Sequence, residues 1–143
     1  MADTRASFMT MEELMRLVSE IRLGGRLAGK RGFLHIHLGT LGGAFGMFMD
    51  AVKRGIPIEH FRPTHCARDL DAAIEFGRAG GMLDFTTDEP EKAADAVLKA
   101  ISGGVPEDRI TLSTDGHGAL PVYAEDGTLR SEEHTSELQS QRD

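Results

Sequence analysis

Hydrophobic side chains recur at helical spacing near the start of the chain. Between residues 11 and 24 they follow the three-and-four spacing of an amphipathic helix, at Met11, Leu14, Met15, Leu17, Val18 and Ile21. Thr10 and Glu13 form a capping box before this stretch, in which the hydroxyl and the carboxylate each accept a hydrogen bond from a backbone amide left unpaired by the helix. The pattern therefore predicts a helix that begins at Met11 and ends near Gly24.

Short β-prone stretches alternate with further helical stretches along the rest of the chain. Strands are predicted at residues 33–37, 60–65, 82–86 and 110–114, and helices at residues 44–54, 69–79 and 90–102. Pro90 stands in the first turn of the last helix, where proline is favoured. Pro63 is a mild objection to the second strand, because proline cannot donate a ladder hydrogen bond. The alternation of helix and strand is typical of a parallel sheet with crossover helices, so the predicted fold class is α/β.

An internal echo relates the second strand to the fourth. Ala51-Val-Lys-Arg-Gly-Ile-Pro57 aligns with Ala100-Ile-Ser-Gly-Gly-Val-Pro106 at a shift of 49 residues, and each stretch leads into a strand. His65 stands at the far end of the first of these strands and Asp115 at the far end of the second. In α/β barrels the chemistry lies at the carboxyl ends of the strands, so the echo favours repeated barrel units. Coincidence is the alternative, because Gly-Ile-Pro and Gly-Val-Pro are common ways to leave a helix.

Composition narrows the class of protein. The 143 residues are 40% hydrophobic and 27% charged with a formal net charge of −7, which is enough chain for one ordinary domain. No segment gathers basic residues, which disfavours nucleic-acid binding, and no apolar run approaches the roughly 18 residues of a membrane span. The first residues lack the apolar stretch of a signal peptide, so we expect a cytoplasmic protein. The single cysteine, Cys66, excludes an internal disulfide.

The last residues differ in character from everything before them. The stretch Arg130-Ser-Glu-Glu-His-Thr-Ser-Glu-Leu-Gln-Ser140 is polar, has no apolar period and follows abruptly on Leu129. It also corresponds to one translated frame of a widely used short-read sequencing adapter. We therefore predict a domain at residues 1–129, followed by a non-native, disordered tail at residues 130–143. A natural disordered tail is the alternative.

Side chains that can bind a metal or carry a proton stand at the predicted strand ends. His35 and His37 lie two residues apart on the first strand and so share one of its faces. Each of these histidines, like His65 and Asp115, is weak evidence alone, because a strand histidine is usually only hydrogen-bonded and a turn aspartate usually only forms the turn. Together, three strands that end in His37, His65 and Asp115 indicate a metal-hydrolase rim.

Two other residues with reactive side chains carry less weight. Cys66 has no evident partner base, which favours a packing role over a nucleophilic role. His60 stands at the start of its predicted strand, at the end opposite His65, and we expect it to be structural.

Several stretches resemble one enzyme family in their order and spacing. They are His37-Leu-Gly39, Pro63-Thr-His65, Arg68, Ala72-Ala-Ile-Glu-Phe-Gly-Arg-Ala-Gly-Gly81 and Leu112-Ser-Thr-Asp115-Gly116. Together they are similar to isoaspartyl dipeptidase, also called β-aspartyl peptidase, which belongs to the amidohydrolase superfamily of metal-dependent (β/α)8 barrels. The resemblance runs from about residue 2 to residue 129. It implies a partial TIM-type barrel, roughly strands five to eight with their helices.

The resemblance also implies a site. His37 and His65 match the histidines that end strands five and six and hold one of two metal ions, usually zinc. Asp115 matches the aspartate that ends strand eight, binds the other ion and manages the proton of the bridging hydroxide, which makes it the expected catalytic residue. Arg5 and Arg68 match arginines that clamp the carboxylates of a small dipeptide substrate.

The chain also departs from that family. The His-x-His pair of strand one and the carboxylated lysine of strand four have no counterpart, since His35-Ile-His37 lies on another strand and His35 is expected behind the ligands or in the barrel interior. Ala119 stands where the family has a substrate-contacting serine. We therefore expect an inactive internal fragment of a longer, homo-oligomeric hydrolase. The alternatives are another amidohydrolase of the dihydroorotase or hydantoinase kind, or a non-catalytic half-barrel.

Overall fold

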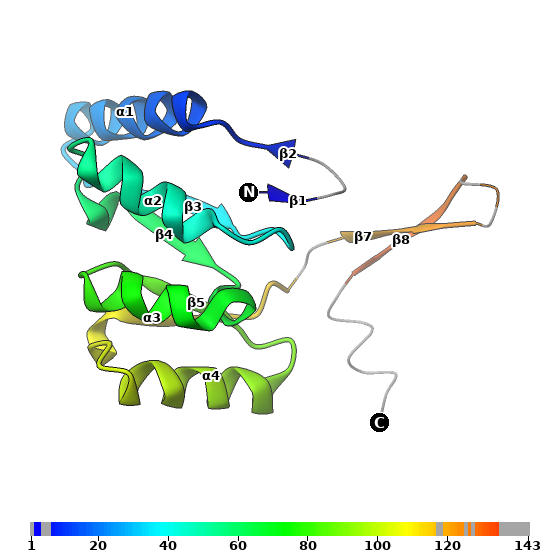
Figure 1. The fold of residues 1–143 in the computed structure, drawn as a ribbon. Coiled ribbons are helices and arrows are strands. Elements are labelled where there is room, and N and C mark those ends of the chain that lie inside the picture. The colour runs from blue at the N-terminus through cyan, green and yellow to red at the C-terminus, as the bar shows by residue number, and fades with distance from the viewer. Residues whose placement is uncertain (1, 4–6, 117–118, 125, 127, 135–143) are drawn as a thin grey trace. The chain divides into compact units, whose positions relative to one another are not determined.

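The computed structural model describes residues 2–3, 7–116, 119–124, 126 and 128–134, and the chain divides into two compact units, Met1–Leu112 and Ser113–Asp143. The first unit alternates helices and strands (Figure 1). The elements in chain order are β1 (Ala2–Asp3), β2 (Ser7–Phe8), α1 (Met11–Leu27), β3 (Leu34–His37), α2 (Ala44–Lys53), β4 (Phe61–Thr64), α3 (Leu70–Arg78), β5 (Leu83–Thr86), α4 (Pro90–Ser102) and β6 (Ile110–Ser113). In the second unit, β7 (Ala119–Tyr123) pairs antiparallel with β8 (Leu129–His134).

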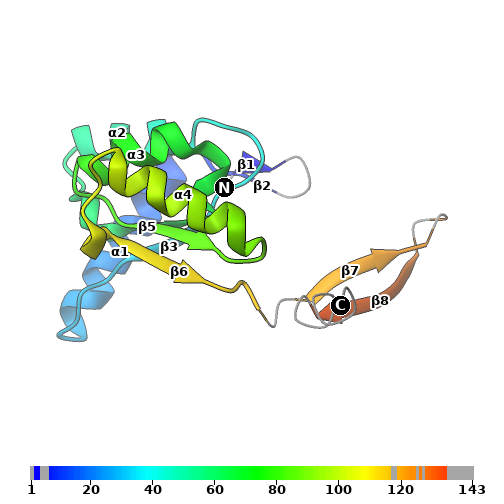
Figure 2. The same ribbon diagram turned by 90° about the horizontal axis from the view of Figure 1, so that it is seen from below.

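The strands β3 to β6 bring their carboxyl ends to one edge. β3 pairs with β4 in a parallel register that sets Leu34 opposite Phe61 and His37 opposite Thr64. The Thr64 hydroxyl donates a hydrogen bond to the Asp84 carboxylate over 2.6 Å, which links β4 to β5, and β5 in turn pairs with β6. Figure 2 shows β5 and β6 running in the same direction with α3 and α4 along one face. This is the arrangement expected when helices connect parallel strands.

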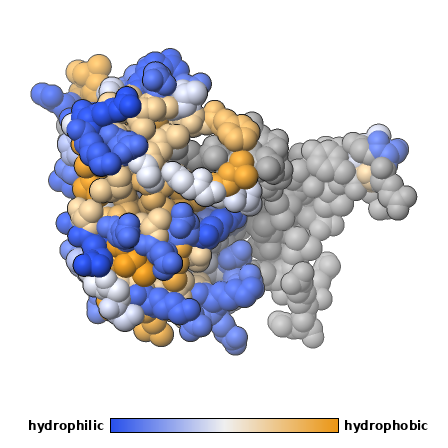
Figure 3. Space-filling view, in the orientation of Figure 1, coloured by the Kyte–Doolittle hydropathy of each residue, from blue (hydrophilic) through white to orange (hydrophobic). Residues whose placement is uncertain are grey.

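Aromatic side chains from helices and strands fill the core. Phe48 of α2 is fully buried, and its ring centroid lies 5.9 Å from that of Phe45, 5.1 Å from that of Phe61 and 5.8 Å from that of Phe76. The removal of these rings from water is the main stabilising contribution to such a core. Hydrophilic side chains cover much of the face shown in Figure 3, with apolar patches between them.

The helices and strands expected between residues 11 and 113 are present, so the predicted α/β class is confirmed. The capping box is formed, because the Thr10 amide donates to the Glu13 carboxylate over 2.7 Å and the Glu13 amide donates to Thr10 Oγ1 over 3.3 Å. α1 continues to Leu27, past the predicted end near Gly24. Gly25 allows the segment after α1 to pass close to the helix, since a Cβ at Gly25 would lie 2.4 Å from the backbone nitrogen of Gly32.

The four short strands at the two ends of the chain were not expected from the sequence. β1 and β2 form a two-residue antiparallel pairing, and β7 and β8 pair in the second unit. The predicted boundary after Leu129 lies within β8, and the division into residues 1–129 and 130–143 stays a prediction. Among the residues that the structure describes, no helix is long and apolar enough to cross a bilayer.

Candidate metal centre

Two histidines meet at the carboxyl edge of β3 and β4. His37 is the last residue of β3, and His65 comes directly after β4, so the parallel register places them side by side. His37 Nδ1 lies 3.0 Å from His65 Nε2, and the ring centroids are 5.0 Å apart. His37 is exposed and His65 is half-buried. The prediction that these two strand ends bring their histidines together is therefore confirmed.

The spacing of the two nitrogens fits a shared metal ion. Zinc binds imidazole nitrogen at about 2.0–2.1 Å with tetrahedral geometry, so two nitrogens on one ion lie about 3.3 Å apart. The observed 3.0 Å is within a few tenths of an ångström of that value. Two neutral imidazoles are also a donor set that zinc prefers. The distance between the two nitrogens is therefore one that a single shared metal ion would impose to within a few tenths of an ångström.

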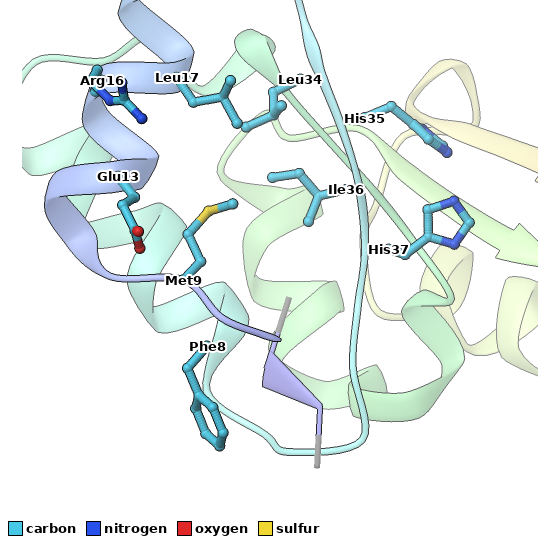
Figure 4. Close-up of a pocket in the computed structure, with 9 residues that line it drawn as sticks. All are labelled: Phe8, Met9, Glu13, Arg16, Leu17, Leu34, His35, Ile36 and His37. Atoms are coloured by element: carbon cyan, nitrogen blue, oxygen red, sulfur yellow. The ribbon is translucent and has the colours of Figure 1, made fainter. Parts of the chain in front are cut away.

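The alternation along β3 directs its histidines away from the core. Leu34 and Ile36 are buried and point toward α1, whereas His35 and His37 are exposed on the opposite side of the strand (Figure 4). A cleft of about 480 Å³ lies between α1, β2 and β3, and both histidines contribute to its lining. The His35 ring contacts the His37 ring edge-on, at a centroid distance of 5.3 Å. The expectation that His35 stands behind the ligands or in a barrel interior stays a prediction.

His65 stands in a left-handed backbone conformation. Its φ is 63° and its ψ is 35°, and it precedes the short 3-10 helix Cys66–Asp69. Non-glycine residues are uncommon in this region, although histidine tolerates it better than most. Such conformations cost of order 1–3 kcal/mol and cluster at functional sites. The sharp turn therefore ends β4 at the residue whose ring faces His37.

Thr86, at the end of β5, makes a contact that sequence analysis did not anticipate. Its Oγ1 lies 2.6 Å from His65 Nδ1, the ring nitrogen that does not face His37. The Thr86 side chain is buried, with 8% of the residue exposed. The sequence did contain one signal for this contact, since Thr86 ends the strand that comes next along the chain after the strand that leads to His65. Threonine is so common in strands that this signal alone is weak.

Asp115 comes two residues after β6, in the second unit. Its backbone is also left-handed, with φ of 50°, and the residue is exposed. Gly116 beside it donates its amide hydrogen to Thr114 Oγ1 over 3.2 Å, which forms a tight turn. The part of Asp115 as a metal ligand and catalytic residue stays a prediction.

Of the two arginines predicted to bind substrate, the structure describes the surroundings of Arg68. Arg68 lies in the 3-10 helix Cys66–Asp69, and its Nη1 donates a hydrogen bond to the Leu38 carbonyl over 2.5 Å. Together with His65 and Thr86 it lines a cavity of about 250 Å³. Arg5 lies outside the described residues. The substrate contacts of both arginines stay predictions.

Cys66 and His60 have the structural surroundings that were expected. Cys66 is fully buried, and its thiol donates to the Pro63 carbonyl over 3.3 Å. Burial raises the pKa of this thiol to about 12, so the nucleophilic thiolate is disfavoured near neutral pH. His60 precedes β4, and its Nδ1–H donates to the Gly32 carbonyl over 2.6 Å. Both residues therefore serve packing and local structure.

Parallel strands, crossover helices and histidines at the carboxyl edge define an α/β protein of the kind that places its chemistry at that edge. No protein-family profile matches the chain. Among solved structures, it is similar to the β-aspartyl dipeptidase of the thermophilic, keratin-degrading Fervidobacterium islandicum AW-1, crystallised with a β-Asp-Leu dipeptide. The two are 34% identical with a TM-score of 0.77, and the match covers 94% of this chain and 37% of that one. The chain therefore spans little more than a third of the length of that enzyme.

Proposed function

We propose that this chain is part of a metal-dependent hydrolase of isoaspartyl dipeptides. The observation that carries the proposal is the imidazole pair, with His37 Nδ1 and His65 Nε2 3.0 Å apart at the carboxyl edge of parallel strands. The 34% identity to a β-aspartyl dipeptidase supports the choice of substrate class. In this proposal β3 to β6 are strands five to eight of a (β/α)8 barrel in the amidohydrolase superfamily.

His37, His65 and Asp115 are the proposed metal ligands. Each offers one ligand atom, an imidazole nitrogen from either histidine and a carboxylate oxygen from the aspartate. Two zinc ions, when bound, lower the pKa of coordinated water and polarise the scissile carbonyl. The Asp115 carboxylate accepts the proton of the attacking water and returns it to the leaving amine. A single carboxylate can perform both transfers because it is basic before the attack and acidic after it.

The proposed role of Arg68 is to bind a substrate carboxylate. The Leu38 carbonyl holds its Nη1, and the side chain is otherwise exposed beside the cavity that His65 and Thr86 line. A guanidinium fixed at one end offers its remaining N–H groups in a planar fork that matches a carboxylate. Arg5 is proposed as the second carboxylate-binding arginine, on the basis of the family resemblance.

The 143 residues lack part of the proposed ligand set. Their single His-x-His sequence is His35-Ile-His37, whose His37 supplies the strand-five ligand, and nothing in the chain matches the His-x-His pair of strand one or the carboxylated lysine of strand four. We therefore propose that these residues alone are inactive. Activity would belong to a complete homo-oligomeric enzyme that contains them.

The test uses the complete protein that the gene encodes, with measured zinc content and hydrolysis of β-Asp-Leu. The His37→Ala variant is expected to lose zinc and at least about 100-fold in kcat/KM, since it removes a ligand. His60→Gln is the matched control, because it removes an imidazole that hydrogen-bonds Gly32 instead. Full activity after chelation would contradict metal dependence. Cleavage of dihydroorotate or hydantoin in place of the dipeptide would favour the other amidohydrolases, and no hydrolysis at all would favour a non-catalytic protein.

A further inference from the structure

Thr86 contacts the one ring nitrogen of His65 that the histidine pair does not use. Thr86 Oγ1 lies 2.6 Å from His65 Nδ1, while His65 Nε2 faces His37 Nδ1 over 3.0 Å. The imidazole is therefore held at both of its nitrogens. Thr86 is itself well fixed, since it is 8% exposed and its β-branched side chain is restricted about χ1.

We propose that Thr86 is a positioning residue for metal binding by His65. Its hydroxyl oxygen accepts a hydrogen bond from His65 Nδ1–H, which selects the tautomer whose Nε2 carries no proton. A metal ligand must present an unprotonated nitrogen, and the partner of the other nitrogen decides which tautomer is present. The inference rests on the proposed function, because it names what prepares one ligand of the proposed metal site.

A buried polar bridge fixes the distance between the two side chains. Asp84 accepts hydrogen bonds from the Thr64 hydroxyl over 2.6 Å and from the Thr111 hydroxyl over 2.8 Å. Thr64 precedes His65 in the chain, and Asp84 lies two residues before Thr86 on the same face of β5. The Thr64–Asp84 hydrogen bond therefore holds β4 and β5 in the register that brings the Thr86 hydroxyl to His65, whereas the Thr111 hydrogen bond ties β6 to the other side of β5.

If the hydrogen bond between Thr86 and His65 runs in the opposite direction, a different tautomer of His65 is expected. If the Thr86 hydroxyl donated to His65 Nδ1, the proton of His65 would sit on Nε2, and that N–H would point at His37. Thr86 would then stabilise the fold without preparing a ligand. The two cases differ in the tautomer of His65, which long-range ¹H–¹⁵N correlation spectra of labelled histidine distinguish.

The experiment compares Thr86→Val with Thr86→Ser in the complete protein, with Thr111→Val as control. Thr86→Val keeps the shape and removes the hydroxyl, and Thr86→Ser keeps the hydroxyl. Thr111→Val removes a threonine hydroxyl that bonds Asp84 and the Leu83 carbonyl, and it leaves the His65 contact in place. The readouts are the zinc dissociation constant, from competition with a chromophoric chelator, and the His65 tautomer in zinc-free protein.

We expect Thr86→Val to weaken zinc binding about 10- to 100-fold, in line with the loss of a hydrogen-bond partner of a metal-binding histidine. Thr86→Ser should restore affinity, and Thr111→Val should bind as the unaltered protein does. Unaltered zinc affinity in Thr86→Val, or an Nε2–H tautomer of His65 in the unaltered zinc-free protein, would refute the positioning role of Thr86 but not the proposed metal site. Absence of zinc binding to the unaltered protein would refute the proposed metal site as well. The tautomer measurement needs no variant, so it decides the matter even if Thr86→Val does not fold.

Discussion

Replacement of Phe48 by alanine should cost a large part of the stability of this fold. Phe48 is fully buried, and three phenylalanine rings, those of Phe45, Phe61 and Phe76, surround it at centroid distances of 5.1–5.9 Å. Truncation of a buried phenylalanine typically costs about 3–5 kcal/mol, through lost transfer free energy and the cavity left behind. Aromatic pairs contribute about 0.5–1.5 kcal/mol beyond burial, so three partners place Phe48 in the upper part of that range.

The assay is urea denaturation of the purified protein, followed by far-UV circular dichroism. With a slope of about 2 kcal/mol per molar urea, a loss of about 4 kcal/mol lowers the midpoint by about 2 M. Phe48→Leu retains an apolar side chain of similar bulk and should cost less than Phe48→Ala. Leu98→Ala on α4 is the control, since Leu98 is 64% exposed and its truncation should stay within about 0.5 kcal/mol.

Two results would contradict this reasoning. A midpoint for Phe48→Ala within about 0.3 M of the unaltered protein would mean that Phe48 is not enclosed by the rings around it. Equal losses in Phe48→Ala and Leu98→Ala would mean that stability does not depend on the core described above.

Three further predictions concern titratable side chains. In the complete protein, Asp115→Asn should lower kcat by at least about 100-fold while the fold persists, because the amide cannot accept the proton of the attacking water. Cys66→Ala should keep near-normal kcat. Near-normal kcat in Asp115→Asn, or loss of kcat in Cys66→Ala, would contradict the mechanism. Because burial raises the pKa of Cys66 from 9.0 to about 12, the neutral thiol stabilises the folded state below about pH 9, and this stabilisation is lost as the pH rises toward 12. The urea midpoint of Cys66→Ala should therefore fall less between pH 9 and pH 12 than that of the unaltered protein. The Thr10 amide and hydroxyl lower the pKa of Glu13, so the capping box should stabilise α1 fully above the ordinary carboxyl pKa and lose that stabilisation as the pH falls through the lowered pKa of Glu13. Amide hydrogen exchange in the first turn of α1 should accelerate over the same acid range, and Glu13→Gln should remove this pH dependence.

Local physical rules were enough to predict most of the first unit from the sequence. The capping box at Thr10 and Glu13 fixed the start of α1, because its hydrogen bonds join residues only three apart. β1 and β2 could not be predicted, since two-residue strands carry no hydrophobic period. α1 extends past Gly24, and Gly25 in this extension lies close to the backbone of Gly32, a contact between separate segments that spacing does not reveal.

The candidate site likewise has features that the sequence predicts and features that only the three-dimensional structure reveals. Strand order alone indicates that His37 and His65 share an edge, because parallel strands end on the same side. Which nitrogens face each other depends on the left-handed turn at His65 and on side-chain rotation, and neither follows from a pattern of residue types. The Thr86 contact joins residues 21 apart through the register of β4 and β5, so it becomes visible only in three dimensions.

His65 and Asp115 are the non-glycine residues with positive φ among those that the structure describes. Glycine adopts this conformation without the steric penalty that a Cβ brings, which is about 1–2 kcal/mol for most residues. In a library of single substitutions, glycine at either position should therefore survive a screen for thermal stability and fail a screen for zinc retention. The two rankings should diverge at positions 65 and 115 and agree in the core, where loss of Phe48 harms both. A thermostability campaign on this sequence would need to hold these two positions fixed, because stability alone selects against the residues that the proposed chemistry requires.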